Sequence, residues 1–295
     1  MSAHYLDFSD FSAADTRAVL ARAAANKAQK RAPRLAGRFL LMLFERPSTR
    51  TRISFSAAMA RAGGHSAALD EAASQMSRGE SVADTARAVS KMCDAVMIRA
   101  RRHDTVAEFA AHAACPVING LSDRSHPCQV LADVMTFGEL RGGLEGKKIA
   151  WLGDFSNVFF SWAQAAAMFG AELSAACPPQ YRPQTPPDGV AVAESAAQAA
   201  EGAALVMTDV WTSMGGEDES EARKKAFSEY AVDAALMQKA AADAVFMHCL
   251  PAHRGEEVSA EVMDGKQSAV WQQAENRMHA QQALLEFLML GEDAL

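Results

Sequence analysis

The sequence predicts an α/β protein with two doubly wound parallel-sheet domains joined by helices. Short runs that are apolar on both faces alternate with longer helical patterns, which is typical of strands in a covered parallel sheet. A glycine-rich, charged stretch at 138–148 interrupts this alternation midway. A long amphipathic pattern runs from about Ser268 to Leu290, and we expect this helix to pack back onto the first domain.

Local signals predict where the individual elements begin and end. Ser81 is an expected helix N-cap, and Thr105 with Glu108 forms an expected capping box. Gly63 and Gly170 are expected to end helices, because glycine adopts the left-handed conformation found there. The expected strands are 38–44, 95–99, 116–120, 148–153, 172–177, 204–210 and 244–250. The predicted domains are residues 1–138, completed by 276–295, and residues 139–275.

Composition limits the possible partners. The 295-residue chain is 49% apolar and 22% charged, as expected for a globular protein with a buried core. Its formal net charge of −7 argues against binding to nucleic acid or an anionic membrane, since both require a broad positive surface. An anionic small molecule can still bind to a local cluster of positive groups.

The N-terminus and the cysteines favour a cytoplasmic chain. The first ten residues, MSAHYLDFSD, have neither the basic nor the apolar segment of a signal peptide. No stretch reaches the roughly 18 consecutive apolar residues of a membrane span. The cysteines are odd in number and form no CxxC pair, which favours reduced thiols: Cys93, Cys115, Cys128, Cys177 and Cys249.

The stretch LFERPSTRTRISF, residues 43–55, predicts a phosphate site. An apolar strand ends before a proline, and Ser48 then stands where the N-cap of a helix over 49–62 belongs. Helix N-termini bind anions through their free amides and the positive end of the dipole. Arg50 is expected to contact the ligand, and Arg52 to have a structural role. The side chains that match a phosphate dianion are Ser48, Thr49, Arg50 and Thr51.

Reactive side chains follow three other expected strands, at the edge where open α/β sheets bind ligands. His126 opens H-P-C-Q at a helix start, where an imidazole can polarise an acyl oxygen. Asp209, in T-D-V-W-T-S-M-G-G, can hold an ammonium group, and Cys249 closes a strand in H-C-L-P. Each also has an ordinary explanation: a helix cap, a turn-forming aspartate and an inert buried thiol.

We expect neither a dinucleotide cofactor nor a metal. The stretch GDFSNV after a strand has only Gly153, whereas a dinucleotide fingerprint needs three glycines for close approach to the pyrophosphate. His248 and Cys249 are neighbours on a strand, so their side chains point to opposite faces and would not bind one metal ion.

Together the motifs resemble the aspartate/ornithine carbamoyltransferase family, and in detail its ornithine-specific members. S-T-R-T-R, H-P-C-Q, D-V-W-x-S-M-G and H-C-L-P occur in family order and spacing, and the likeness covers essentially the whole chain. The resemblance implies transfer of the carbamoyl group of carbamoyl phosphate to the δ-amine of L-ornithine, giving L-citrulline and phosphate in arginine biosynthesis. It also implies a homotrimer or a multiple of trimers, with active sites at subunit interfaces.

The resemblance assigns roles to individual residues. As catalytic residues it implies Arg50, Arg99, His126, Asp209 and Cys249. As carbamoyl-phosphate ligands, with Gln75 reaching a neighbouring subunit's site, it implies Ser48, Thr49, Arg50, Thr51, Gln75, Arg99, His126, Pro127, Cys128, Gln129, Cys249, Leu250 and Arg277. As ornithine ligands it implies Asn157, Asp209, Ser213 and Met214.

The chain departs from the family pattern at two places, and other functions stay open. After S-M-G, Gly216 precedes Glu217 where a glutamate is common. Phe155 and Ser156 stand where the family usually has Gly and Asn, which alters the loop before Asn157. Aspartate carbamoyltransferases usually carry H-P-L-P instead of H-C-L-P. Enzymes acting on acylated ornithine or putrescine are further alternatives, as is a non-catalytic scaffold, although the motifs are intact.

Overall fold

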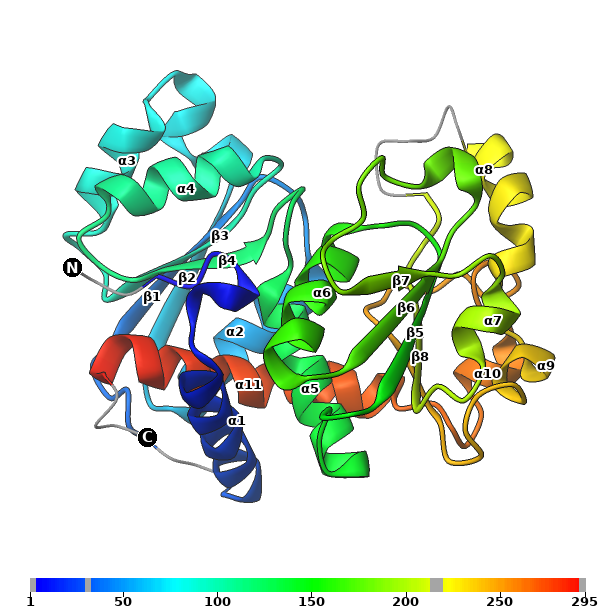
Figure 1. Cartoon of the computed structure of the whole chain (residues 1–295). Helices are drawn as coiled ribbons and strands as arrows, with labels where there is room; N and C mark the ends of the chain where they lie inside the picture. The colour runs from blue at the N-terminus through cyan, green and yellow to red at the C-terminus, as the bar shows by residue number, and fades with distance from the viewer. Residues whose placement is uncertain (1–3, 30–32, 213–219, 292–295) are drawn as a thin grey trace. The chain divides into compact units, whose positions relative to one another are not determined.

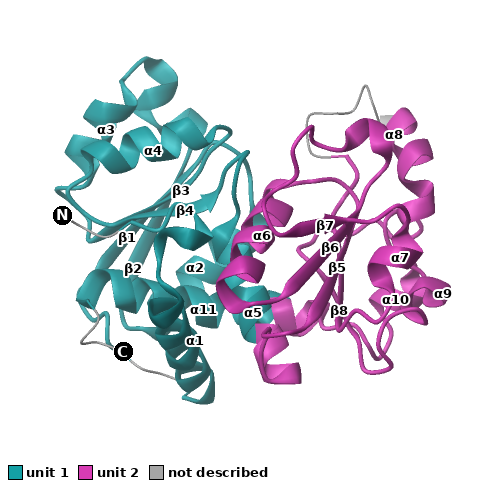
Figure 2. Ribbon diagram, in the orientation of Figure 1, with its two compact units in different colours: residues 1–135, 274–295 teal, residues 136–273 magenta. Residues whose placement is uncertain are grey.

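The chain forms two compact units, each built on its own parallel sheet. The structure is a computed structural model that describes residues 4–29, 33–212 and 220–291. Unit 1 comprises residues 1–135 and 274–295, and unit 2 comprises residues 136–273 (Figure 2). Both units are parallel α/β sheets with helices, which confirms the predicted fold class (Figure 1).

Unit 1 has a four-stranded sheet in the order β2-β1-β3-β4. Its strands are β1 (Phe39–Phe44), β2 (His65–Asp70), β3 (Ala95–Arg99) and β4 (Val117–Leu121). Its helical segments are η1 (Phe8–Asp10), α1 (Ala13–Ala28), α2 (Thr49–Arg61), η2 (Glu71–Ala73), η3 (Gln75–Arg78), α3 (Val82–Val89) and α4 (His103–His112), with parts of α5 (Pro127–Arg141) and α11 (Val270–Leu290). β2 lies on one side of β1, and β3 lies on the other side of β1. The direction in which strands are added to the sheet therefore reverses between β1 and β3.

Helices cover both faces of this sheet. α3 and α4 lie over one face, and α2 and α11 lie over the other (Figure 1). Leu41 and Leu43 of β1 belong to the same buried cluster as Phe109 of α4. Since alternate strand residues point to opposite faces, Met42 points towards the other helical layer.

Unit 2 has a five-stranded sheet in the order β7-β6-β5-β8-β9. Its strands are β5 (Lys148–Leu152), β6 (Glu172–Ala176), β7 (Val190–Val192), β8 (Leu205–Thr208) and β9 (Val245–His248). Its helical segments are α6 (Asn157–Phe169), η4 (Pro179–Tyr181), α7 (Ala196–Ala200), α8 (Ser220–Phe227), η6 (Ser228–Tyr230), α9 (Ala234–Met237) and α10 (Ala260–Met263). Here the order reverses between β5 and β8.

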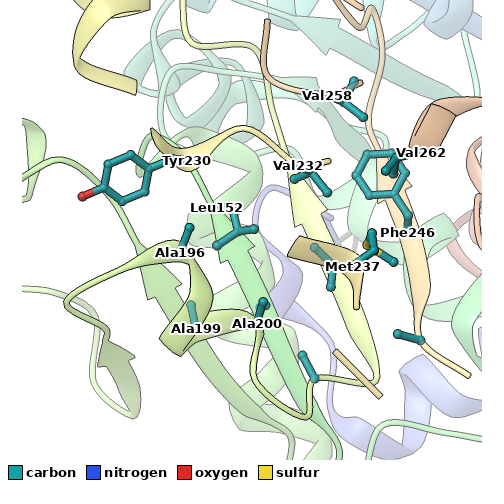
Figure 3. Packing of buried hydrophobic residues seen from close by; sticks show 14 of the residues in the cluster. Leu152, Ala196, Ala199, Ala200, Tyr230, Val232, Met237, Phe246, Val258 and Val262 are labelled. Carbon is teal, nitrogen blue, oxygen red and sulfur yellow. The ribbon is translucent and has the colours of Figure 1, made fainter. Parts of the chain in front are cut away.

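A buried apolar cluster packs α7, α9 and α10 against the sheet of unit 2 (Figure 3). Leu152 and Phe246 supply strand side chains to this cluster, and Ala196 and Ala199 supply the facing side of α7. Alanine has no side chain beyond Cβ, so the short helix α7 can lie close to the strands.

Most of the local predictions are confirmed. Each expected strand is present, and Ser81 caps α3 by accepting a hydrogen bond from the amide of Asp84 at 3.0 Å. Gly170 ends α6 with a φ of +69°, and Gly63 follows α2 with a φ of +79°. The two additional strands, β2 and β7, form the outer edges of the sheets next to β1 and β6.

Two expectations about helix ends are wrong. α4 begins at His103 rather than at Thr105, because the carboxylate of Asp123 accepts a hydrogen bond from the His103 amide at 2.6 Å. A residue from a different segment therefore replaces the local cap. α5 continues through Gly138 to Arg141, into the stretch 138–148 that was expected to interrupt the alternation of strands and helices. The predicted domain boundary at 138/139 stays a prediction.

The described helices include none that combines the length and apolarity needed to cross a lipid bilayer.

A buried carboxylate anchors α11 to the N-terminal part of unit 1. Glu286 has a fully buried side chain, 2.7 Å from Nε of Arg22 on α1. Its other oxygen, Oε1, accepts hydrogen bonds from Asn26 at 3.2 Å and Gln282 at 2.9 Å. The C-terminal helix thus packs on unit 1, as predicted.

We expect Glu286→Ala to destabilise unit 1 by about 3 kcal/mol, because it removes the partner of a largely buried guanidinium. The measurement is urea unfolding followed by fluorescence and circular dichroism. Glu275→Ala is the matched control, since Glu275 lies on the same helix with a side chain 59% exposed. Equal unfolding midpoints for the two variants would contradict this anchor.

Candidate functional site

Many of the sequence-predicted residues that the structure describes lie near the places where each sheet reverses its strand order. In unit 1 the segments that follow β1, β3 and β4 meet at the C-terminal edge of the sheet, since all the strands are parallel. In unit 2 the segments that follow β5 and β8 do the same, with β9 beside β8. Open α/β sheets bind ligands at these positions. We call the two places the unit 1 site and the unit 2 site.

The N-terminus of α2 forms one wall of the unit 1 site. Ser48 is its N-cap, in an extended conformation, and its hydroxyl accepts a hydrogen bond from the Thr51 amide at 3.4 Å. Thr49 is exposed and Arg50 is half-buried in the first turn, where no helical carbonyl precedes their amides. Arg52 pairs with Asp70, and its guanidinium lies over the Phe44 ring at 4.7 Å, contacts that suit the structural role expected of it.

Arg277 of α11 joins three helices in the unit 1 site. The side chain is buried, and its guanidinium donates to Oε1 of Gln129 at 2.5 Å and to Oγ1 of Thr51 at 2.8 Å. Gln129 in turn donates to Asp133 at 2.8 Å. Because Thr51 accepts from Arg277, its hydroxyl proton can be donated to a ligand.

His126 is a buried, neutral imidazole among three guanidiniums. Burial lowers the pKa of His126 well below its usual value, and the positive charges of Arg277, Arg99 and Arg50 lower this pKa further. The ring is therefore uncharged at neutral pH and can donate one hydrogen bond without adding a fourth cation. Arg99 is itself only 9% exposed.

The pairing of β3 with β4 shifts register at Arg99, the last residue of β3. Ile98 pairs with Asn119, but Arg99 pairs with Leu121, so Gly120 is the extra residue on β4. A Cβ atom at Gly120 would lie 2.2 Å from Sδ of Met97, which explains the glycine. Bulges often redirect side chains beside functional sites.

Three side chains from different segments are hydrogen-bonded in the unit 2 site. Asp209, after β8, accepts from the hydroxyl of Ser156 at 3.0 Å and from the thiol of Cys249 at 3.1 Å. The Val210 amide also donates to its Oδ1 at 2.8 Å. Ser156 is the N-cap of α6, and Asn157 is the first residue of that helix.

A buried histidine–glutamate pair supports the backbone after Cys249. Nδ1 of His248 accepts a hydrogen bond from the Leu250 amide at 2.9 Å, which leaves the proton on Nε2. Nε2 lies 3.3 Å from Oε1 of Glu257, whose side chain is fully buried. Leu250 has a φ of +61°, a conformation that costs energy for a non-glycine residue. Sequence reasoning missed Glu257, because nothing in the H-C-L-P motif indicates its buried partner.

Comparisons with known proteins match both units. Residues 3–139 match the model "Aspartate/ornithine carbamoyltransferase, carbamoyl-P binding domain", and residues 145–288 match "Aspartate/ornithine carbamoyltransferase, Asp/Orn binding domain". The chain belongs to the aspartate/ornithine carbamoyltransferase family. This confirms the resemblance seen in the motifs.

Several members of this family are close relatives of the chain. The ornithine carbamoyltransferase of Halorhodospira halophila is 52% identical over 297 residues, covering 98% of this chain and 99% of the relative. The solved ornithine carbamoyltransferase of Pyrococcus furiosus has a TM-score of 0.93 at 41% identity, covering 98% of each chain. That of Burkholderia thailandensis has a TM-score of 0.90 at 44% identity, covering 98% of this chain and 99% of the other.

The remaining residues implied by the carbamoyltransferase resemblance range from fully buried to exposed. Cys128 is fully buried, and its thiol points to the carbonyl of Asn119 at 3.4 Å. Burial raises the pKa of Cys128 to about 12, so the thiol stays protonated. Gln75 is exposed on η3, and Pro127 is the first residue of α5. Ser213 and Met214 lie outside the described residues.

One group of side chains near the unit 2 site has atoms of the kind that bind metals. The ligand atoms of His253, Glu256 and Glu257 lie within 4.8 Å of one another. Glu256, however, is 3.0 Å from the ammonium of Lys224, and Glu257 already faces His248. Carbamoyl transfer needs no metal, so we assign none to this group.

The low pKa of His126 predicts a pH-dependent stability. Below about pH 6.5 the unfolded chain protonates this histidine, whereas the folded chain keeps it neutral. Stability is therefore fully present above this pH and falls as the pH decreases, by at most about 1.4 kcal/mol per pH unit for this group. We expect His126→Asn to lose less stability than the wild type between about pH 7.5 and about pH 5.5.

Urea unfolding at each pH, in buffer free of phosphate, measures this difference. The wild type serves as the reference at every pH, because burial also lowers the pKa of His4 and His279 and both proteins share that contribution. Parallel stability curves for wild type and His126→Asn would contradict a neutral, buried His126.

Proposed function

We propose that this chain transfers the carbamoyl group of carbamoyl phosphate to the δ-amine of L-ornithine, giving L-citrulline and phosphate. The observation that carries the proposal is the neutral His126 among three guanidiniums at the N-terminus of α2. This arrangement matches a dianionic phosphate joined to a polarisable carbonyl. Residues 1–138 with 276–295 are proposed as the carbamoyl-phosphate domain, and residues 139–275 as the ornithine domain.

The phosphate is proposed to bind at the start of α2. The amides of the first turn and the helix dipole favour an anion there. The hydroxyls of Ser48 and Thr49 supply further donors, and Arg50 supplies a planar fork for two phosphate oxygens. Bound phosphate would also offset the positive charge of the three arginines.

The carbonyl oxygen of the carbamoyl group becomes anionic during the attack. Thr51, Arg99 and His126 are proposed to stabilise it, because preorganised donors at a developing oxyanion lower the barrier. Loss of one such donor typically costs about 3–4 kcal/mol of transition-state stabilisation. Gln129, oriented by Arg277 and Asp133, has a further N–H and a lone pair for the carbamoyl amide.

The unit 2 site is proposed to bind ornithine. The Asp209 carboxylate suits its α-ammonium group, and the Asn157 amide at the N-terminus of α6 suits its α-carboxylate. Ser213 and Met214 are proposed to complete the site, as the resemblance implies. Cys249 and Leu250 are proposed to line the place where the δ-amine meets the carbamoyl carbon.

The attacking amine must lose a proton during the reaction. His126 is a poor acceptor, because burial and, after it, the charges of three guanidiniums lower the pKa of its imidazole. Asp209 and Cys249 can orient the amine, and the departing phosphate can take the proton. We therefore propose the leaving group as the proton acceptor.

Two further proposals concern direction and assembly. Carbamoyl phosphate is a mixed anhydride and citrulline is a urea, so transfer to ornithine is the downhill direction and suits arginine biosynthesis. The exposed position of Gln75 on η3 leaves it available to a neighbouring subunit. A homotrimer, or a multiple of trimers, would use it in that way, and light scattering of the purified chain tests this.

The proposed activity predicts citrulline formation from carbamoyl phosphate and L-ornithine. Purified protein is assayed in parallel with L-ornithine, L-aspartate, putrescine and N-acetyl-L-ornithine, and the carbamoylated product is identified by mass spectrometry. We expect ornithine to be the preferred amine by at least about 100-fold in kcat/KM, because an unmatched buried carboxylate is costly.

Arg50→Ala and Arg52→Ala are the matched variants for this assay. Arg50→Ala is expected to lower kcat/KM for carbamoyl phosphate by about 10²–10³-fold. Arg52→Ala is expected to stay within a few-fold, because Arg52 contacts Asp70 and Phe44 instead. Preference for another amine would reject ornithine as the substrate, and equal activities of the two variants would reject the phosphate site.

The hydrogen bond from Ser156 to Asp209 leads to a separate prediction about the KM for ornithine. Ser156→Ala removes the hydroxyl that donates to Asp209, and a hydrogen bond to a charged group is worth about 1.5–3 kcal/mol. We expect KM for ornithine to rise about tenfold while KM for carbamoyl phosphate is unchanged. Ser195→Ala is the control, because Ser195 caps α7 in the same unit by accepting from the Gln198 amide at 3.2 Å. A similar rise in Ser195→Ala would show that capping, not Asp209, explains the effect.

A further inference from the structure

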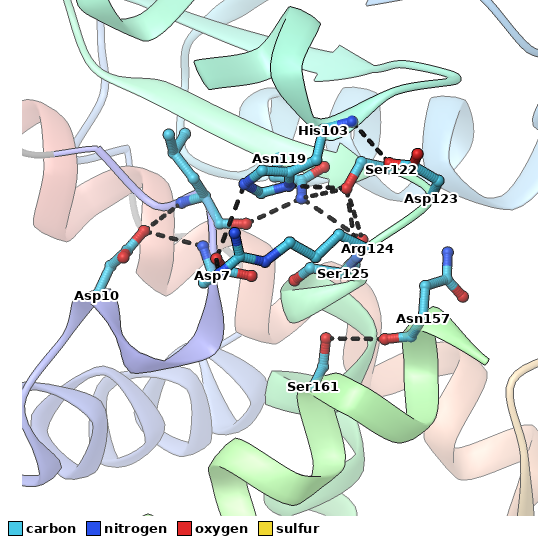
Figure 4. A network of polar contacts seen from close by, with 11 residues as sticks. Asp7, Asp10, His103, Asn119, Ser122, Asp123, Arg124, Ser125, Asn157 and Ser161 are labelled. Atoms are coloured by element: carbon cyan, nitrogen blue, oxygen red, sulfur yellow. Dashed lines mark hydrogen bonds and ion pairs between the residues drawn. The ribbon is translucent and has the colours of Figure 1, made fainter. Parts of the chain in front are cut away.

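The segment that precedes His126 is a closed turn around the hydroxyl of Ser122 (Figure 4). The Ser122 amide donates to the carbonyl of Ser125 at 2.9 Å, and the Ser125 amide donates to the Ser122 hydroxyl at 3.3 Å. Both serines are buried, at 0% and 1% exposure. His126 follows Ser125 directly, so its backbone continues from this hydrogen-bonded turn.

Asn119 of β4 contacts this turn through its side-chain amide. Its side chain is fully buried, and Nδ2 lies 2.8 Å from the Leu6 carbonyl, 3.2 Å from the Ser122 hydroxyl and 3.4 Å from the Ser125 carbonyl. The Asn119 amide also donates to the carbonyl of Tyr5 at 2.8 Å. One asparagine thus connects the turn to the N-terminal segment.

His103 holds the turn from the side of α4. Its Nδ1 lies 2.9 Å from the Ser122 hydroxyl, and its Nε2 lies 3.7 Å from the carboxylate of Asp7. Asp7 also pairs with Arg124, within the turn, at 3.1 Å. With the proton of His103 on Nε2 and facing Asp7, the single proton of the Ser122 hydroxyl can be donated to Nδ1 at 2.9 Å or to the Ser125 carbonyl at 3.4 Å. The hydroxyl oxygen accepts from Asn119 and from the Ser125 amide. One donor and two acceptors are the full capacity of a hydroxyl.

We propose that Ser122, Asn119 and His103 are positioning residues that place His126 for carbamoyl transfer. They act through His126 and are not proposed to touch substrate. The imidazole must meet the same carbonyl oxygen that Thr51 and Arg99 are proposed to contact, and a displacement of about 1 Å can cost about 100-fold in rate. Residues on β4 and α4 hold such geometry better than a free loop would. The inference rests on the proposed function.

A double-mutant cycle with Ser122→Ala and His126→Asn tests this positioning role. On the wild-type background we expect Ser122→Ala to lower kcat by about 10- to 100-fold. On the His126→Asn background the same change is expected to lower kcat less than about twofold, because the group it positions is absent. A purely structural role would lower kcat by the same factor on both backgrounds.

Ser90→Ala is the matched control for the loss of a buried hydroxyl in unit 1. Ser90 is 6% exposed and accepts a hydrogen bond from the Ala114 amide at 2.9 Å, outside the His126 turn. We expect it to destabilise the protein about as much as Ser122→Ala while kcat is unchanged. If Ser122→Ala does not fold, His103→Ala replaces it in the same cycle, with the same expected pattern.

The outcomes separate the two levels of the proposal. An inactive wild type with every amine rejects the proposed function itself. An active wild type with unchanged kcat in Ser122→Ala, or with equal losses on both backgrounds, rejects only the positioning role. A large loss on the wild-type background alone supports it.

Discussion

The buried guanidinium of Arg277 is the contact on which the unit 1 site depends. It lies on the last helix, yet its acceptors belong to the N-termini of α5 and α2. By accepting from Arg277, Thr51 and Gln129 take fixed orientations, and its charge also disfavours protonation of His126. A buried cation requires such acceptors, since leaving it unpaired is costly. The return of α11 to unit 1, with Glu286 as a second anchor, is therefore part of the site.

The two units share one arrangement of strand, helix N-cap and charged side chain, but the charge is opposite in sign. In unit 1, β1 leads into α2, whose N-cap is Ser48. In unit 2, β5 leads into α6, whose N-cap is Ser156. The neighbouring strand then supplies the charged side chain, Arg99 in unit 1 and Asp209 in unit 2. Opposite charges at equivalent places explain why one site suits an anion and the other an ammonium group.

Sequence reasoning succeeded where the signal is local. Strands buried on both faces read as apolar runs, and serine N-caps precede α2 and α3. β2 and β7 were missed because edge strands are partly exposed, and β7 has only three residues. Contacts between distant segments leave no local signal either: Arg277 and Thr51 are 226 residues apart, and Asp123 caps α4 from a loop 20 residues away. Motif resemblance could name such residues, but it could not indicate their partners.

The charges of the two sites also limit how the proton leaves. Asp209 already accepts from Ser156, Cys249 and the Val210 amide, so most of its acceptor capacity is used to fix its orientation. A carboxylate held in this way suits an ammonium group that stays bound throughout the reaction. Burial lowers the pKa of His126, and the neighbouring guanidiniums lower this pKa further, so the imidazole stays neutral. Phosphate gains negative charge as it departs, so it becomes a better proton acceptor at the moment when the amine becomes acidic. In the mechanism we propose, the two sites therefore supply binding and charge stabilisation, and the leaving group supplies the base.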